Sequence, residues 1–151
     1  MREITAYTVG SCFDNPGAGG YAAILQCGKE TRHVAGICGE KTTNNRIELL
    51  AVVKVLEWLN NIQKEPCFIT IKTQSAYLCT CVDHTKKDPK WLTSEKRPNG
   101  NLWTYLCDLA KAGKHKIQFV KVKAHSGDKL NEQCDATARA KAKEAKAALG
   151  G

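Results

Sequence analysis

Apolar residues recur at helical spacing in the stretch from Thr43 to Leu59, TNNRIELLAVVKVLEWL. On a helix, positions 48, 52, 55 and 59 lie along one face, and Val52, Val55 and Leu59 make most of that face apolar. The fourth position is Glu48. Burying a carboxylate without a partner costs several kcal/mol by order of magnitude, so this pattern predicts a cation, a metal ion or a proton beside Glu48.

Two interpretations of Glu48 are open at this point. Asn45 and Glu48 have the spacing of a capping box, in which the glutamate would only help to start the helix. In the second interpretation, Glu48 belongs to a functional site near the start of the helix. The rest of the chain has to decide between them.

The remaining segments alternate between strand and helix patterns. We expect strands at Arg2–Ser11, Tyr21–Cys27, Thr31–Cys38, Cys67–Lys72 and Lys116–Lys123, and further helices at Ser75–Val82, Asn101–Ala112 and Leu130–Leu149. In the helix at 101–112 the inward residues should be Leu102, Tyr105, Leu106 and Leu109. A hairpin at Gly28-Lys29-Glu30 makes the first three strands antiparallel, whereas strand–helix–strand units favour parallel pairing of the first, fourth and fifth strands. This order predicts an α/β fold, a mixed sheet flanked by helices, as one domain over residues 1–151.

The net charge of the chain indicates which class of partner it binds. The chain has 151 residues, with 23 Lys and Arg against 15 Asp and Glu, which gives a net charge of +8. Such an excess favours polyanions, and nucleic acid first among them. We expect no membrane-spanning segment, since no apolar run is long enough. Eight cysteines without a CxxC pair, and a start without the apolar run of a signal peptide, predict free thiols in the reducing cytoplasm.

A basic segment, HTKKDPKWLTSEKRPNG, lies between the second and third expected helices. Its candidate phosphate-binding residues are Lys86, Lys87, Lys90, Trp91, Lys96 and Arg97. Lysines around an aromatic ring bind phosphates and stack on sugars. The alternative is an ordinary solvated surface, with Trp91 packed inward.

Five motifs then follow one another along the chain: YTVGSCFDNPGAGGYAAIL, TTNNRIELLAV, IKTQSAYL, KWLTSEKRPNGNLW and VKAHSGDKLNEQCDATARA. In order and spacing the chain resembles type 1 ribonuclease H over almost its whole length. The resemblance implies a ribonuclease H-like fold, a five-stranded mixed sheet with helices packed on it. It also implies cleavage of the RNA strand of an RNA/DNA hybrid by two Mg²⁺ ions, held by four acidic residues.

Two of the four acids implied by the resemblance are replaced. The family's TDGS motif reads TVGS here, with Val9 in place of the acid, and the family's TDS motif reads TQS, with Gln74. The other two acids match Glu48 and Asp135. Valine cannot bind a metal and glutamine adds no charge, so we expect at most one weakly held ion at Glu48 and Asp135, with Mg²⁺ weak or absent. The resemblance also gives His125, in the loop before the last helix, a role in proton movement or product release.

The binding residues implied by the resemblance survive better. Positions that read RNA through its 2′-hydroxyl groups match Cys12, Asn15, Asn44 and Asn45, and a phosphate pocket for the DNA strand matches Lys41, Thr43 and an asparagine at 99 or 101. Neutral amides suit a 2′-hydroxyl because it both donates and accepts hydrogen bonds. As alternatives, Asn15 shapes a turn and Asn45 caps the helix. One family glutamine is replaced by Ala76.

These observations favour a ribonuclease H-like domain that binds RNA/DNA hybrid or double-stranded RNA and has lost most or all of its catalysis. The first alternative is an active or weakly active Mg²⁺-dependent ribonuclease H that cleaves RNA in RNA/DNA hybrids. The second is a non-catalytic scaffold that binds a protein partner.

Overall fold

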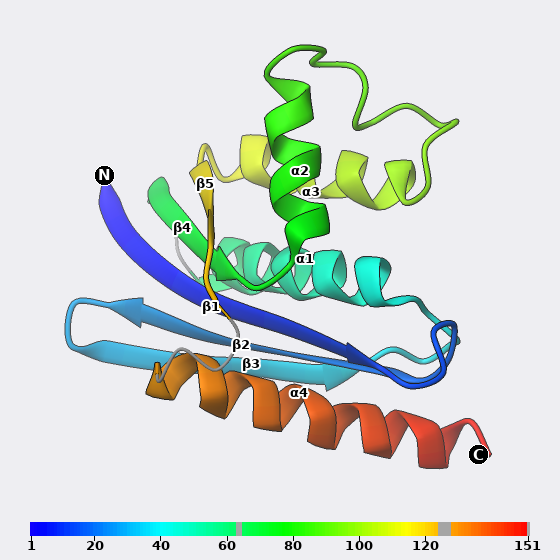
Figure 1. Ribbon diagram of the computed structural model, residues 1–151. Helices are drawn as coiled ribbons and strands as arrows, with labels where there is room; N and C mark the ends of the chain where they lie inside the picture. Colours follow the sequence, from blue (N-terminus) through cyan, green and yellow to red (C-terminus); the bar gives the residue numbers. More distant parts are fainter. Residues whose placement is uncertain (63–64, 124–127, 151) are drawn as a thin grey trace.

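A five-stranded mixed sheet forms the centre of the molecule (Figure 1). The computed structural model describes residues 1–62, 65–123 and 128–150. The strands are β1 (Arg2–Cys12), β2 (Gly19–Cys27), β3 (Glu30–Ile37), β4 (Cys67–Thr73) and β5 (Lys116–Lys121), in the spatial order β3-β2-β1-β4-β5. Pairing is antiparallel between β1 and β2 and between β2 and β3, and parallel between β1 and β4 and between β4 and β5. The predicted mixed sheet is confirmed.

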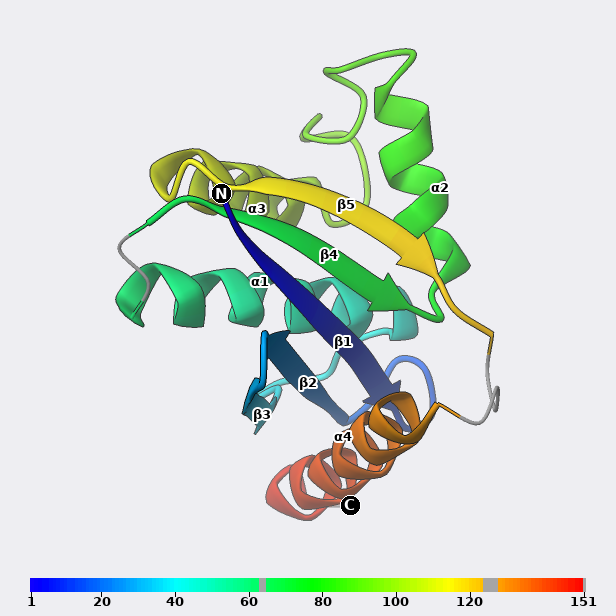
Figure 2. The same ribbon diagram turned by 90° about the vertical axis from the view of Figure 1, so that its left-hand side faces the viewer.

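Helices cover both faces of this sheet (Figures 1 and 2). On one face lie α1 (Asn44–Ile62), α2 (Ala76–Thr85) and α3 (Gly100–Ala112), and on the other lies α4 (Lys129–Ala148). Among the helices that the structure describes, none has the length and apolar character needed to cross a membrane. All eight cysteines are free thiols.

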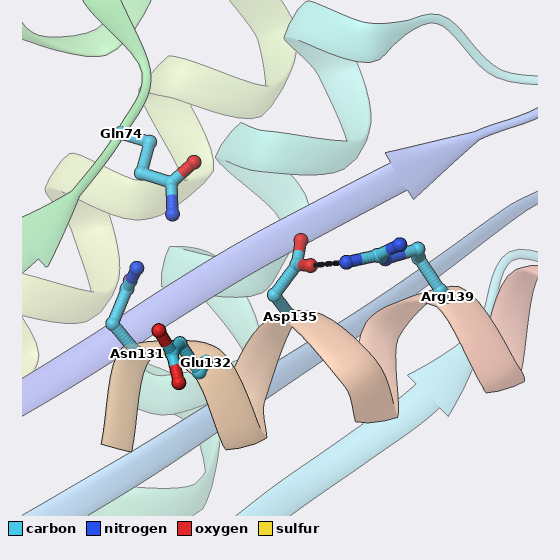
Figure 3. A pocket seen from close by; sticks show the side chains of 5 residues that line it. All are labelled: Gln74, Asn131, Glu132, Asp135 and Arg139. Atoms are coloured by element: carbon cyan, nitrogen blue, oxygen red, sulfur yellow. Dashed lines mark hydrogen bonds and ion pairs between the residues drawn. The ribbon is translucent and has the colours of Figure 1, made fainter. Parts of the chain in front are cut away.

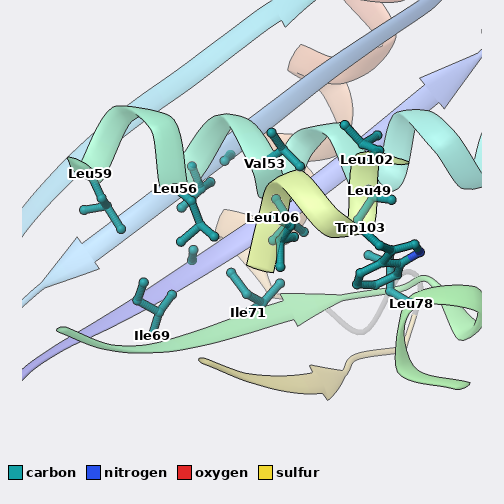
Figure 4. Packing of buried hydrophobic residues seen from close by; sticks show 14 of the residues in the cluster. Leu49, Val53, Leu56, Leu59, Ile69, Ile71, Leu78, Leu102, Trp103 and Leu106 are labelled. Carbon is teal, nitrogen blue, oxygen red and sulfur yellow. The ribbon is translucent and has the colours of Figure 1, made fainter. Parts of the chain in front are cut away.

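The main core lies between α1 and the sheet (Figure 4). The strand β4 alternates buried and half-buried residues, as a strand with one covered face does, and its Ile69 and Ile71 face Val53 and Leu56 of α1. Each such fully buried aliphatic side chain contributes about 1.5–3 kcal/mol. The core fixes α1, and with it the position of Glu48.

A smaller core joins α4 to the opposite face of the sheet. It consists of Val9, Ala22, Ile24, Cys134 and Ala138, with Leu130 at its margin. The helix lies so close to β2 that a side chain at Gly20 would meet the Ala142 backbone nitrogen at 2.3 Å. On the other face, a side chain at Gly10 would meet the Glu48 backbone nitrogen at 2.7 Å. These close approaches bring α1 and α4 to the same end of β1.

The predicted elements are all present, with ends shifted by at most three residues. One of the two interpretations of Glu48 is excluded, and one residue predicted to face inward does not. The helix α1 is capped by Thr43, whose hydroxyl oxygen accepts the Arg46 backbone N–H at 3.2 Å, so Asn45 and Glu48 do not form a capping box. Tyr105 does not face inward: it is 42% exposed, and its hydroxyl donates to the Glu57 carboxylate at 2.7 Å.

Candidate active site and nucleic-acid interface

Val9 and Gln74 lie where the parallel pairing between β1 and β4 ends. The last paired residues of β1 and β4 are Thr8 and Thr73, and Val9 and Gln74 follow them directly. The Val9 side chain is buried in the small core against α4. The Gln74 amide instead extends toward α4 across an open space (Figure 3). The structure therefore brings the two replaced positions to the same edge of the sheet.

A polar cavity of about 480 Å³ opens at this edge (Figure 3). Its lining residues are Gln74, Asn131, Glu132, Asp135 and Arg139. Gln74 and Asp135 were predicted from the motifs, whereas Asn131, Glu132 and Arg139 were not. The signal was available, because residues 131, 132 and 139 are within one helical turn of Asp135.

Asp135 already has a cationic partner. The Arg139 guanidinium donates a hydrogen bond to the Asp135 carboxylate one turn further along α4 (Figure 3). The Asp135 side chain is 26% exposed, whereas that of Arg139 is 62% exposed. The negative charge of Asp135 is thus offset within the protein itself.

The carboxyl group of Glu48 is buried, which disfavours its charged form. Burial, and to a smaller extent the charge of Asp135, raise the pKa of Glu48 to about 7, although a backbone hydrogen bond from Gly10 acts in the opposite direction. Its Oε2 atom is shielded from solvent and has no hydrogen-bond partner among the described residues. The buried Oδ1 of Asn131 is likewise unpaired within the described part of the chain. Two oxygen acceptors near the cavity are therefore left without donors.

Cys134 is the buried neighbour of this pair of acids. Its thiol donates to the Ala22 carbonyl oxygen at 3.1 Å. Burial is the main reason that the pKa of Cys134 rises to about 12, and the charges of Glu48 and Asp135 add to it. Cys134 is therefore a packing residue whose thiol stays protonated at neutral pH.

The four residues matched to RNA reading lie together on the turn between β1 and β2 and on the first turn of α1. The side-chain oxygen of Asn15 accepts the Asn44 backbone N–H at 2.9 Å, and the Cys12 thiol donates to the Thr42 carbonyl at 3.3 Å. The side chains of Asn44 and Asn45 are exposed at the N-terminal end of the helix. The structural role expected for Asn15 and its proposed contact with RNA are compatible, because its amide NH₂ group is not used in this bond.

The phosphate-pocket residues are brought together only in part. Arg46 donates to the side-chain oxygen of Asn99 at 3.2 Å, and the Asn99 amide donates to the Tyr77 hydroxyl at 3.3 Å. Asn99, rather than the asparagine at 101, therefore lies beside the end of α1 that Thr43 caps. Lys41 lines a different cavity, formed by the turn between β1 and β2 and by the end of α4.

The basic segment after α2 exposes its lysines. Lys86, Lys87, Lys90 and Lys96 are all exposed. The half-buried Trp91 ring lies between two protein groups, with its centroid 4.0 Å from that of the His84 ring and 3.7 Å from the Arg97 guanidinium carbon. Trp91 also packs against the main core, in agreement with the inward-packed alternative, and the exposed positive charges around it are those of the lysines and Arg97. His125, the other residue expected at the site, lies outside the described residues.

The fold and the ends of its strands define a domain of the ribonuclease H-like class. The family model described as RNase H matches residues 1–143, and the chain belongs to this family. It is 41% identical to a ribonuclease H of Caldicellulosiruptor saccharolyticus, over 95% of this chain and 99% of that protein. It is 42% identical to a ribonuclease H of Salmonella arizonae, over 94% and 90% of the two chains. The fold is also that of LC11-RNase H1 solved in complex with an RNA/DNA hybrid, with a TM-score of 0.76 at 18% identity over 94% of this chain and 98% of that one.

Proposed function

We propose that this domain binds RNA/DNA hybrid or double-stranded RNA in a reducing cytoplasm and cleaves it far more slowly than its relatives, if at all. The observation that carries the proposal is the pair Val9 and Gln74, which directly follow the last paired residues of β1 and β4, where the family's motifs have acids. A hydrocarbon and a neutral amide replace two negative charges at positions that hold metal ions in the family.

The residues present do not suit a pair of Mg²⁺ ions. Members of the family generally depend on Mg²⁺. Here the Asp135 carboxylate is ion-paired with Arg139, and burial raises the pKa of Glu48 to about 7, which disfavours its charged form at neutral pH. Two divalent ions need several charged carboxylates to replace their water ligands, and two of the four that the family uses, Glu48 and Asp135, remain here. A single weakly bound ion at Glu48 and Asp135 is the most that the set supports.

The binding side of the proposal rests on the surface around the start of α1. The exposed amides of Asn44 and Asn45, and the free NH₂ group of Asn15, point to a partner that both donates and accepts hydrogen bonds, as a 2′-hydroxyl does. The exposed lysines after α2 and the net charge of +8 favour a phosphate backbone. LC11-RNase H1, which shares the fold, was solved with a hybrid bound.

Binding is tested by fluorescence anisotropy with hybrid, RNA duplex and DNA duplex of one sequence, over a range of salt. We expect hybrid or RNA duplex to bind more tightly than DNA duplex, with affinity that falls steeply as salt rises. Asn44→Ala should remove part of the preference for RNA. It should leave the salt dependence unchanged, because a neutral amide neutralises no phosphate and so releases no counterion. Equal affinity for all three duplexes, or affinity that is insensitive to salt, would contradict the proposal and favour a protein-binding scaffold.

One observation favours a second candidate, an active enzyme with a rearranged metal site. The unpaired Glu48 Oε2 and Asn131 Oδ1 are oxygen acceptors near the cavity, and Glu132 adds a carboxylate to its lining. If these atoms hold ions, Asn131→Leu should abolish Mn²⁺ binding measured by calorimetry. Cleavage of hybrid that is lost in the same variant would establish this candidate over the first.

A further inference from the structure

A second cavity lies between the C-terminal end of α4 and the turn that joins β1 to β2. Its volume is about 300 Å³, and its lining residues are Phe13, Asp14, Pro16, Gly17, Ala18, Lys41, Lys146 and Leu149. We call it the Phe13 pocket. It combines two lysines with an aromatic ring, and neither Phe13 nor Lys146 was predicted as a binding residue from the sequence.

The pocket is assembled by three separate segments that are firmly held. Phe13 donates its backbone N–H to the Ala18 carbonyl at 2.8 Å, which closes the turn. Gly17 and Thr42 exchange two backbone hydrogen bonds of 2.9 and 2.7 Å, so the turn is fixed to the segment that carries Lys41. The third segment is the end of α4, which lies beside this turn (Figure 1).

Lys146 is placed over the Phe13 ring. Its Nζ atom lies 5.0 Å from the ring centroid, within the range of a cation–π contact. On α4, the residues Asp135, Arg139, Ala142 and Lys146 follow one another in steps of four, three and four. They therefore share one side of the helix. That side leads from the cavity at Asp135 to the Phe13 pocket.

We propose that the Phe13 pocket binds the sugar-phosphate backbone of the RNA strand, beyond the nucleotides that Asn15 and Asn44 contact. This inference rests on the proposed function. Asn15 lies between two residues that line the pocket, Asp14 and Pro16, so a strand held at Asn15 passes the pocket next. Lys41 and Lys146 supply two positive charges against the one negative charge of Asp14, and the ring supplies an apolar surface for a ribose.

The surroundings of the pocket favour a phosphate over other partners. Both lysines are exposed, and neither forms an ion pair with the residues that the structure describes. Only Phe13 and Leu149 add large apolar side chains to its lining, which is too little apolar surface to bury a protein segment. The charge of Lys41, expected from the resemblance to serve the DNA strand, acts here on the other strand.

The test compares the salt dependence of hybrid binding among charge-matched variants of the full chain. Lys146→Gln should weaken binding at low salt by about threefold to tenfold and reduce the slope of log K against log salt by about one, because one phosphate contact is lost. Lys143→Gln and Lys29→Gln are the controls. They remove the same charge from the solvent side of α4 and from the distant hairpin between β2 and β3, and should change the slope by much less.

A second pair of variants addresses the geometry of the pocket. Lys146→Arg should restore the slope, and Phe13→Leu should weaken binding while leaving the slope unchanged, since a ring carries no charge. If Lys146→Gln behaves like Lys29→Gln while Asn44→Ala still reduces the preference for RNA, the Phe13 pocket proposal is wrong and the proposed function stands. If the wild-type chain binds no hybrid even at low salt, both are wrong.

Discussion

The Arg139 guanidinium is hydrogen-bonded to the Asp135 carboxylate, on consecutive turns of α4. Asp135 is one of the two acids that remain from the four expected in the family. Its charge is offset by a side chain of the same helix, while Glu48, the other acid, is raised in pKa by burial. Both features lower the attraction of the site for a divalent ion.

Removing Arg139 should therefore make the site more attractive to metal. In Arg139→Gln, Asp135 keeps its charge and loses its partner, so we expect Mn²⁺ to raise the melting temperature by a few degrees, equivalent to about 1 kcal/mol. The wild-type chain and Lys143→Gln should show a much smaller shift, measured in the same thermal unfolding assay. A wild-type shift as large as that of Arg139→Gln would show that Arg139 does not compete with metal.

Restoring the two lost carboxylates should restore catalysis at a cost in stability. Val9 is 5% exposed and packs against Cys134 and Ala138, so Val9→Asp with Gln74→Asp should lower the free energy of unfolding by about 2–4 kcal/mol in the absence of metal. Mg²⁺ should recover part of this loss, and cleavage of hybrid should appear.

The matched control for that double variant is Val9→Asn with Gln74→Asn, which has the same side-chain size and no added charge. We expect this control to be destabilised, insensitive to Mg²⁺ and inactive. If the aspartate variant folds, binds hybrid and still does not cleave it, the site differs from an active one by more than its two missing acids.

The raised pKa of Glu48 makes stability depend on pH in a defined direction. Because the folded-state pKa of about 7 is above the ordinary value of 4.5, the folded state binds the proton more tightly. The stability linked to this proton is complete below about pH 4.5 and is lost as the pH rises through 7. Glu48→Gln should remove this loss, and should exceed the wild-type chain in stability at pH 8 by about 2–3 kcal/mol more than at pH 4.5. Urea unfolding at both pH values measures the difference, and equal differences would contradict the assignment.

His115 should make stability depend on pH in the opposite direction. Its Nδ1 accepts the Cys67 backbone N–H at 3.0 Å, its Nε2 lies 2.8 Å from the Asn60 side-chain oxygen, and burial lowers its pKa below 6.5. A histidine with a depressed pKa contributes stability above pH 6.5, which is lost as the pH falls through the folded-state value. His115→Gln should reduce stability at pH 7 by about 1–3 kcal/mol, because the Cys67 N–H loses its acceptor.

The control for His115 is the exposed His33 on β3. His33→Gln should leave both the stability at pH 7 and its decline toward pH 5 nearly unchanged. An equal effect of the two substitutions in urea unfolding would mean that the buried contacts of His115 contribute nothing.

Local patterns predicted the elements well, since strand alternation and helical periodicity report which face of each element is covered. The stripe of Val52, Val55 and Leu59 is buried as its spacing indicated. Tyr105 was misplaced because the apolar face of α3 is centred on Trp103, which is 1% exposed, and this moves position 105 to the flank of the helix. Helical spacing alone does not fix the centre of a buried face.

The site was predictable where a motif marks it and unpredictable where tertiary packing makes it. The motifs located Val9, Glu48, Gln74 and Asp135. The buried amide of Asn131 and the approach of α4 to β2 at Gly20 depend on contacts between segments more than a hundred residues apart in the chain. The Phe13 pocket could not be predicted either, because three segments distant in sequence form it.

The most direct test of the central claim is a single-turnover cleavage assay on an RNA/DNA hybrid that is fully bound, with Mg²⁺ and then Mn²⁺ in excess. The ribonuclease H of Caldicellulosiruptor saccharolyticus serves as the reference. We expect the hybrid to be bound and to be cut at least about 100-fold more slowly than by the reference, since missing metal ligands cost several kcal/mol of barrier. A rate within about 100-fold of the reference would contradict the account.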